Sequence, residues 1–176
     1  MNRFAKEDSP TIMKFDALST SNKLKDEDND NTFEWPIPLS LSIWLVVSSC
    51  FFLIPGIYAF STRCYFYGVV STITTINSVN HWRKAESGFR QNVDRVVATI
   101  SFVIYLVTGL CFLRGLLLFA LALPGVILII LCFHLSHKMA EAGSGRWIYF
   151  HFSFHVFVAL EQLLVVYAMV QSGVSF

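Results

Sequence analysis

Two histidines four positions apart carry the strongest chemical signal in the sequence. The segment HisPheSerPheHis occupies residues 151–155. On a helix His151 and His155 share a face, with Cβ atoms about 5–6 Å apart. Two neutral imidazoles at that spacing can bind one Zn²⁺, since the Zn–N distance is about 2.0–2.1 Å. The alternative interpretation is that the two rings lie at a membrane interface and bind no metal. A spacing of four residues between two histidines also occurs by chance.

A third histidine and an aspartate extend the pair to a possible catalytic metal site. His81 ends one apolar segment and Asp94 begins the next. With His81, His151 and His155 as zinc ligands, the fourth position of a tetrahedral ion stays open for water, as in catalytic zinc sites. Zinc lowers the pKa of that water to about 7 and polarises a carbonyl group. Asp94 would accept the proton of the water as general base.

Polar residues precede His81 at helical spacing. Thr74, Asn77, Ser78 and His81 form one stripe along a helix. Inside a membrane, a polar stripe must face protein or water rather than lipid. We expect Asn77 or Ser78 to orient water or a substrate carbonyl.

Four further polar residues receive other interpretations. His134 and His137 are interpreted as interfacial residues rather than ligands. Glu161 is an intramembrane carboxyl group, which indicates either a functional role or a protonated group bonded to a neighbouring helix. Gln162 lies on the same helical face as the histidine pair.

Membrane-spanning helices are the elements that would position these residues. The chain of 176 residues is 55% hydrophobic and 14% charged, whereas soluble domains contain about 25% charged residues. A span needs about 20 apolar residues. We predict an all-α membrane protein, with a polar and disordered tail over residues 1–35 and a transmembrane helical bundle over 36–176. Its five predicted spans lie near 37–60, 64–81, 94–113, 115–134 and 147–170.

The composition also limits which classes of binding partner are expected. A net charge of +1 gives no electrostatic support for a nucleic-acid partner, so membrane lipids are the expected partners. The first apolar run begins near Ile37 behind an acidic tail, and we expect it to be retained as an anchor rather than cleaved. The four cysteines adjoin apolar runs and are expected to be thiols: Cys50, Cys64, Cys111 and Cys132.

Positive charges predict the orientation. Of the 13 Lys and Arg residues, 11 fall on the side that holds the tail, the 82–93 loop with Arg95, and the 135–146 loop. The cytoplasmic side of a membrane protein carries this excess. We therefore expect a cytoplasmic N-terminus and an extracellular or lumenal C-terminus. All five histidines then lie toward the cytoplasm, where three tryptophans would form an interfacial belt: Trp35, Trp82 and Trp147.

Three motifs resemble the CREST superfamily of membrane hydrolases and receptors, which includes the alkaline ceramidases and the progestin and adipoQ receptors. They are ThrThrIleAsnSerValAsnHisTrp at 74–82, AsnValAspArg at 92–95 and HisPheSerPheHisVal at 151–156. The resemblance implies that the three histidines of these motifs bind zinc and that the aspartate partners the zinc-bound water. The chain departs from the family in two respects. The family has seven spans, and its serine stands four residues before the first histidine, where this chain has Asn77.

The sequence thus favours a zinc-dependent membrane hydrolase of a lipid amide or ester. The alternative is a non-catalytic membrane scaffold or receptor-like protein with a structural or vestigial metal site. A transporter or channel subunit is a third hypothesis, based on Glu161, Gln162 and two Pro-Gly pairs. It needs a polar path through the bundle, whereas the polar residues are expected mainly in the cytoplasmic half.

Overall fold

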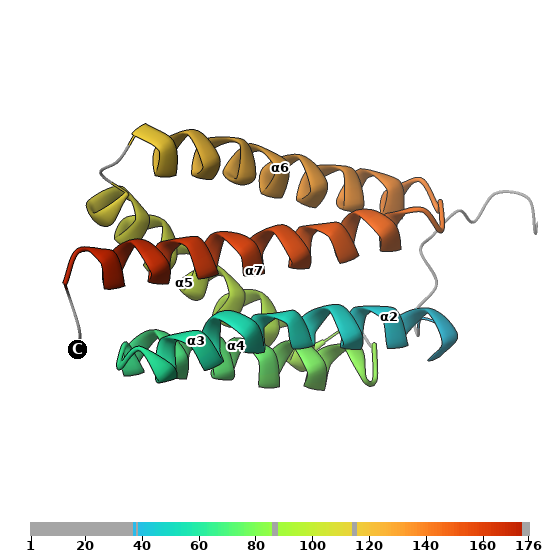
Figure 1. The fold of residues 1–176 in the computed structure, drawn as a ribbon. Helices are drawn as coiled ribbons and strands as arrows, with labels where there is room; N and C mark the ends of the chain where they lie inside the picture. Colours follow the sequence, from blue (N-terminus) through green and yellow to red (C-terminus); the bar gives the residue numbers. More distant parts are fainter. Residues whose placement is uncertain (1–36, 38, 86–87, 114–115, 174–176) are drawn as a thin grey trace, which may run out of the picture. The chain divides into compact units, whose positions relative to one another are not determined.

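The computed structural model describes residues 37, 39–85, 88–113 and 116–173, and within these ranges all regular structure is helical. The predicted tail, residues 1–35, lies outside the described residues. The all-α fold is confirmed. The elements, drawn in Figure 1, are α2 (Leu39–Ser49), the 3₁₀ turn η2 (Cys50–Phe52), α3 (Leu53–Ser61), α4 (Tyr65–Trp82), α5 (Phe89–Phe112), α6 (Leu116–Glu141) and α7 (Trp147–Gln171).

Four helical segments are long and apolar enough to cross a membrane: 41–61, 89–112, 118–141 and 147–171. Large apolar side chains cover their outer surfaces, and Leu110, for example, is 74% exposed. Water would disfavour such continuous apolar surfaces, whereas lipid does not. The chain is therefore an integral, multi-pass membrane protein.

The fifth helix, α4, is less apolar but is fully part of the bundle. It packs against α3 on one side and α5 on the other. Its inward face carries small hydroxyl side chains, including Ser71, Thr75 and Ser78, each at most 5% exposed. This polar face lowers the hydropathy of α4, and its contacts with protein explain why a polar helix is tolerated there.

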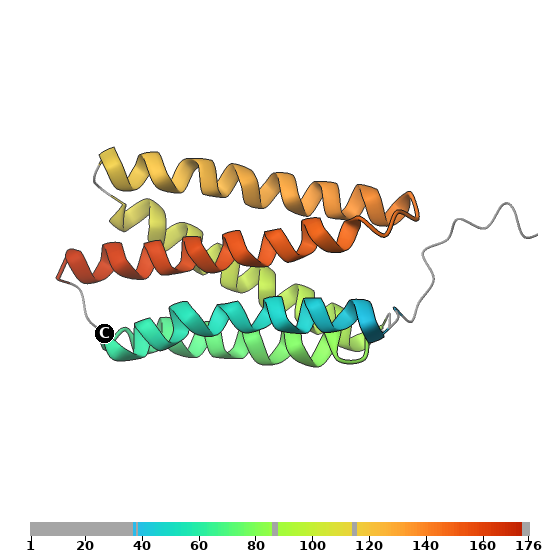
Figure 2. The ribbon, with the colours of Figure 1, turned by 45° about the vertical axis from the view of Figure 1, so that its right-hand side comes forward.

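α7 is the central helix of the bundle. It contacts α2, α3, α5 and α6, and both ribbon views show it between α6 and the α2–α3 segment (Figures 1 and 2). With α2 and α3 taken together as one span, successive spans run in alternating directions (Figure 1). The ends of α4 and α6 therefore lie at the same end of the bundle as the beginnings of α5 and α7 (Figure 1).

The first span departs from α-helical geometry just before its proline. The sequence predicts a span over 37–60 with a kink at Pro55-Gly56, and the departure is the 3₁₀ turn Cys50–Phe52. Pro55 has no N–H to bond the carbonyl of Phe51, and its ring crowds that carbonyl. The strain is thus accommodated one turn earlier. By contrast, α6 continues without a break through Pro124.

Two helices are longer than hydropathy predicts. α5 begins at Phe89 rather than near residue 94, and α6 continues to Glu141 rather than ending near residue 134. Backbone hydrogen bonds continue a helix after its side chains become polar, so an apolar window underestimates both lengths. Asp94 consequently lies in the second turn of α5, and His134 and His137 lie within α6.

Buried polar side chains join α4, α5 and α7 near the middle of the bundle. The Gln162 carbonyl oxygen of α7 accepts a bond from Ser71 Oγ at 3.5 Å, and its amide donates to Ser101 Oγ at 3.4 Å. Tyr105 Oη lies 2.8 Å from Ser71 Oγ. Such bonds between helices are typical of membrane proteins, where apolar contact alone does not drive association.

Two tryptophans expected in an interfacial belt face the protein instead. Trp82 and Trp147 are 6% and 7% exposed, and their ring centres lie 6.1 Å apart. They pack with Leu45 and Ile148 at the end of the bundle where α7 begins. The amphipathic rings therefore close this end of the bundle rather than anchoring it in lipid headgroups. No disulfide joins the four cysteines, all of which belong to the described ranges.

We predict that α4 crosses the membrane. The test uses sealed membranes and a chain whose native cysteines are replaced by alanine. Ser61→Cys and Lys84→Cys should then react with a membrane-impermeant maleimide from opposite sides of the membrane. The reason is that both residues are exposed, and that Ser61 lies just before α4 begins whereas Lys84 lies just after α4 ends. With the N-terminus in the cytoplasm, residue 84 should react from the cytoplasmic side. Labelling of both positions from the same side would contradict the prediction.

We also predict that Gly56 is required for the close approach of α3 and α4. A Cβ atom at Gly56 would lie 3.2 Å from Ser71 Cβ. Gly56→Val should therefore lower the free energy of unfolding by about 1–3 kcal/mol through overpacking, measured by denaturation in mixed detergent micelles. Gly145→Val is the matched control, since a Cβ there meets no atom within 4 Å. Equal stability of the two variants would show that the α3–α4 contact is not tight.

Candidate functional site

The candidate site lies at the end of the bundle where α4 and α6 end and α5 and α7 begin (Figure 1). His81 is the next-to-last residue of α4 and is 2% exposed. His151 and His155 occupy the first two and a half turns of α7, and His155 is 3% exposed. The three histidines selected from the sequence therefore belong to the same end of the bundle.

The two histidines of α7 have adjacent rings. The ring centres of His151 and His155 are 4.7 Å apart, with an angle of 70° between the ring planes. Two imidazoles bound to one tetrahedral zinc ion have ring centres about 5 Å apart, given a Zn–N distance of about 2.0–2.1 Å. The separation of the ring centres is therefore close to that of two imidazoles on one ion, as the spacing of the two residues along the helix predicts.

His155 is held by a serine of α2. Ser48 Oγ lies 2.7 Å from His155 Nδ1 and 3.0 Å from the Leu45 carbonyl oxygen. A hydroxyl group has one proton. When Ser48 donates this proton to Leu45, its oxygen accepts a bond from the Nδ1–H of His155. This tautomer leaves the lone pair on Nε2, the nitrogen available to a metal or a substrate.

His151 is held in the same way by a different helix. Ser136 Oγ of α6 lies 3.3 Å from His151 Nδ1. Both rings of the pair thus have a serine hydroxyl at Nδ1, although for His151 either the ring or Ser136 can be the donor. Metal-binding histidines usually have their second nitrogen bonded in this manner, which fixes the orientation of the ring.

Trp82 separates the third histidine from the pair. The Trp82 ring centre lies 4.5 Å from that of His81 and 4.9 Å from that of His151. His81 and His151 are close enough to interact electrostatically. Within the described ranges, however, no three His, Cys, Asp or Glu side chains lie close enough together to hold a metal ion. The three histidines selected from the sequence therefore lie at one end of the bundle but do not form a three-residue metal site in the described part of the chain.

The carboxyl group of Asp94 lies at the end of a row of serine hydroxyl groups from neighbouring helices. It lies near the side chain of Ser78, which stabilises the charged form of the carboxyl group. Ser78 Oγ in turn lies 2.9 Å from Ser49 Oγ of the first span. Of the two candidate polar residues, Ser78 is therefore the one joined to Asp94. Asn77 is partly exposed, and its amide donates to the Ile73 carbonyl of its own helix at 2.9 Å.

The remaining polar residues lie apart from this cluster. His134 and His137 are exposed on α6, and His137 Nε2 lies 3.3 Å from a carboxyl oxygen of Glu141. Glu161 lines a cavity in the other half of the bundle. Neither exposed histidine adjoins the buried pair.

Three serines of the cluster were missed in the sequence: Ser48, Ser49 and Ser136. A serine within an apolar helix ordinarily bonds a carbonyl of its own helix, and Ser48 and Ser49 do contact the Leu45 carbonyl. The one available signal was the adjacent pair Ser48-Ser49 within a membrane span. It does not identify a partner, since His155 lies 107 residues further along the chain.

The fold and the cluster define the class of protein: a multi-pass helical membrane protein with a cluster of imidazole, hydroxyl and carboxyl groups at one end. No protein-family model, no curated protein and no solved structure matches the chain.

We predict that the bond between Ser48 and His155 stabilises the junction of α2 and α7. Ser48→Ala leaves a buried imidazole nitrogen without its partner, which should lower the free energy of unfolding by about 1–3 kcal/mol. A double-mutant cycle with His155→Ala should give a coupling energy of about 0.5–3 kcal/mol. Ser61→Ala is the control, because Ser61 is exposed and bonds its own helix. A coupling energy of zero would contradict the assigned bond.

Proposed function

We propose that this protein is a zinc-dependent membrane hydrolase that acts on a lipid amide or ester, the function implied by the resemblance to the CREST superfamily. The observation that carries the proposal is the α7 histidine pair. Ser48 and Ser136 occupy the Nδ1 atoms of His155 and His151, so both Nε2 atoms remain as donors. In the proposal His81 is the third ligand, and binding of the ion would draw its ring toward the pair, since the three side chains do not form such a group in the described structure.

Burial of His155 supports a function beyond interfacial anchoring. An interfacial histidine keeps its ring in contact with headgroups and water. His155 is 3% exposed and packs against Phe52, with ring centres 5.2 Å apart. An imidazole in such an apolar setting is expensive for a membrane protein to bury. That cost favours a functional role.

The residues of this chain have separate roles in the proposed reaction. The chemistry supplied by bound zinc is polarisation of a carbonyl group and acidification of water. Asp94 accepts a proton from water at a carboxyl oxygen, and Ser78 orients that carboxyl group. Trp82 and Trp147 cover this end of the bundle and limit the access of bulk water. A lipid substrate would approach laterally from the bilayer.

A non-catalytic scaffold or receptor-like protein is the second candidate function. The observation that favours it is that the described residues contain no group of three metal-binding side chains. In that case the histidine pair stabilises the contacts of α7 with α2 and α6, and Asp94 has no part in a reaction. The two functions therefore differ in the consequence of changing Asp94.

Metal content tests the first step of the proposal. Protein purified in a nonionic detergent should contain about one zinc ion per chain by elemental mass spectrometry. The double variant His151→Ala/His155→Ala should lose that zinc, because it removes both nitrogen donors. The control His134→Ala/His137→Ala removes two histidines from the same end of the bundle and should retain it. Wild-type protein without zinc would contradict the proposed hydrolase.

Lipid hydrolysis tests the second step. The wild type should release fatty acid from a mixture of N-acyl and O-acyl lipids, and Asp94→Asn should lower the rate by about 10²–10⁴-fold, the usual contribution of a general base. Asp94→Asn should retain zinc, and Asn77→Ala should retain activity, because Asn77 bonds its own helix. Zinc binding without any fatty-acid release would support the scaffold instead.

A further inference from the structure

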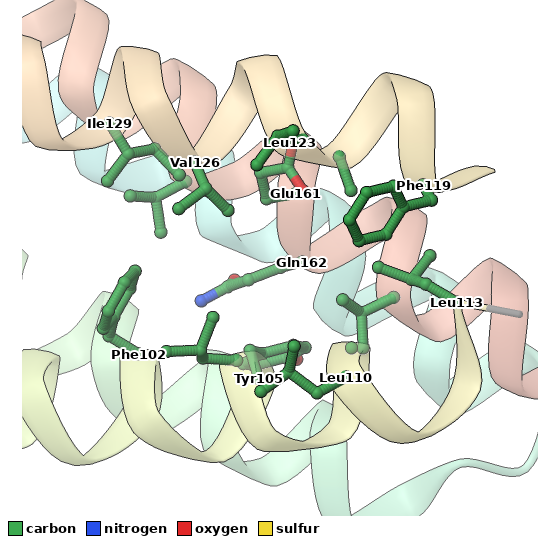
Figure 3. Close-up of a pocket in the computed structure, with 15 residues that line it drawn as sticks. Phe102, Tyr105, Leu110, Leu113, Phe119, Leu123, Val126, Ile129, Glu161 and Gln162 are labelled. Carbon is green, nitrogen blue, oxygen red and sulfur yellow. The ribbon is translucent and has the colours of Figure 1, made fainter. Parts of the chain in front are cut away.

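A cavity lies in the half of the bundle away from the histidine cluster, between α5, α6 and α7. Its volume is about 340 Å³, which is within the range of small-molecule sites, about 300–1,000 Å³. Figure 3 shows side chains of α5 and α6 on opposite walls, with Gln162 and Glu161 of α7 between them. The walls are otherwise almost entirely apolar; they include Phe102, Leu110, Phe119, Leu123 and Ile129.

The cavity opens toward lipid. α5 and α6 each pack against α7, while the described parts of α5 and α6 have no extensive contact with each other. Leu110 and Phe119, which line the cavity from the two sides of this gap, are 74% and 50% exposed. A molecule dissolved in the bilayer therefore reaches the cavity laterally between α5 and α6.

Glu161 is the one acidic side chain on the cavity wall. Within the described ranges no hydrogen bond or ion pair to its carboxyl group is found, in contrast to Glu141, which lies beside His137. The carboxyl group fits against the backbone of α6, because a Cβ atom at Gly125 would overlap with a Glu161 carboxyl oxygen. The absence of a side chain at Gly125 thus makes room for this carboxyl group in the cavity.

The side-chain amide of Gln162 is not bonded to the carboxyl group of the neighbouring Glu161. Its amide is directed to Ser71 and Ser101 on α4 and α5. The cavity therefore contains one acidic group, the carboxyl group of Glu161, among mainly apolar side chains. A carboxylate in such surroundings attracts a cation strongly, because the local dielectric constant is low.

We propose that this cavity binds a membrane-soluble amine, with an apolar tail or ring system against α5 and α6 and an ammonium group at Glu161. Charge complementarity selects the ammonium group, and the apolar walls select a hydrocarbon body. A bare inorganic cation is excluded by the same walls, since Ca²⁺ takes 6–8 oxygen ligands and Mg²⁺ also needs several. The site is separate from the histidine cluster and does not depend on zinc or hydrolysis.

Binding of a matched pair of probes tests the proposal. Dodecylamine is protonated at neutral pH, whereas dodecanol has the same tail and no charge. Native mass spectrometry of the full-length protein in a nonionic detergent should detect one bound dodecylamine, with an affinity at least about tenfold above that for dodecanol. Equal affinity for the two probes, or binding of neither, would overturn the proposal.

Two variants and a control test the charge of Glu161 and the volume of the cavity separately. Glu161→Gln keeps the shape of the side chain and should abolish the preference for the amine. Ala122→Leu fills the cavity from α6, where Ala122 is 5% exposed, and should lower dodecylamine binding at least about tenfold with Glu161 intact. Glu141→Gln makes the same chemical change on the exposed end of α6 and should bind like the wild type. Retention of the amine preference in Glu161→Gln would overturn the assignment. If Glu161→Gln does not fold, undiminished binding of dodecylamine by Ala122→Leu would overturn it instead.

Discussion

Polar groups buried within a bilayer must find partners on neighbouring helices, and the rest of this structure depends on that constraint. α7 carries three such groups along its length. His151 bonds a serine of α6, His155 a serine of α2, and Gln162 serines of α4 and α5. These bonds fix the rotation of the central helix about its axis, because any other rotation would turn an imidazole or an amide toward lipid.

The same constraint divides the bundle into two halves with different chemistry. At one end, imidazole, hydroxyl and carboxyl groups from five helices form a cluster covered by two tryptophans. In the other half, α5 and α6 diverge around an apolar cavity that contains one carboxyl group. Polar contacts between helices extend into this half, where Tyr67 Oη lies 2.8 Å from Thr108 Oγ1. The sequence predicts polar residues mainly in the cytoplasmic half, because its histidines and the end of its most polar segment fall on that side.

Much of the fold was predictable, because the apolar length of each segment is a local property. The histidine pair was predictable for the same reason, since residues four apart on a helix are neighbours whatever surrounds them. The choice between Asn77 and Ser78 was not, because adjacent residues point about 100° apart and only the position of α5 decides which one meets Asp94. The inward orientation of Trp82 likewise depends on the position of α7, a helix that begins 65 residues later in the sequence.

The sequence by itself determined the membrane environment, the helical fold, the approximate spans and the spacing of the α7 histidines, because hydropathy and helical periodicity act over a few turns. Tertiary structure alone decided the partners of those histidines, the burial of two tryptophans and the existence of a cavity around Glu161. Each of these depends on how helices distant in the sequence pack together. A serine in an apolar helix bonds its own backbone by default, so only packing determines which serines reach an imidazole.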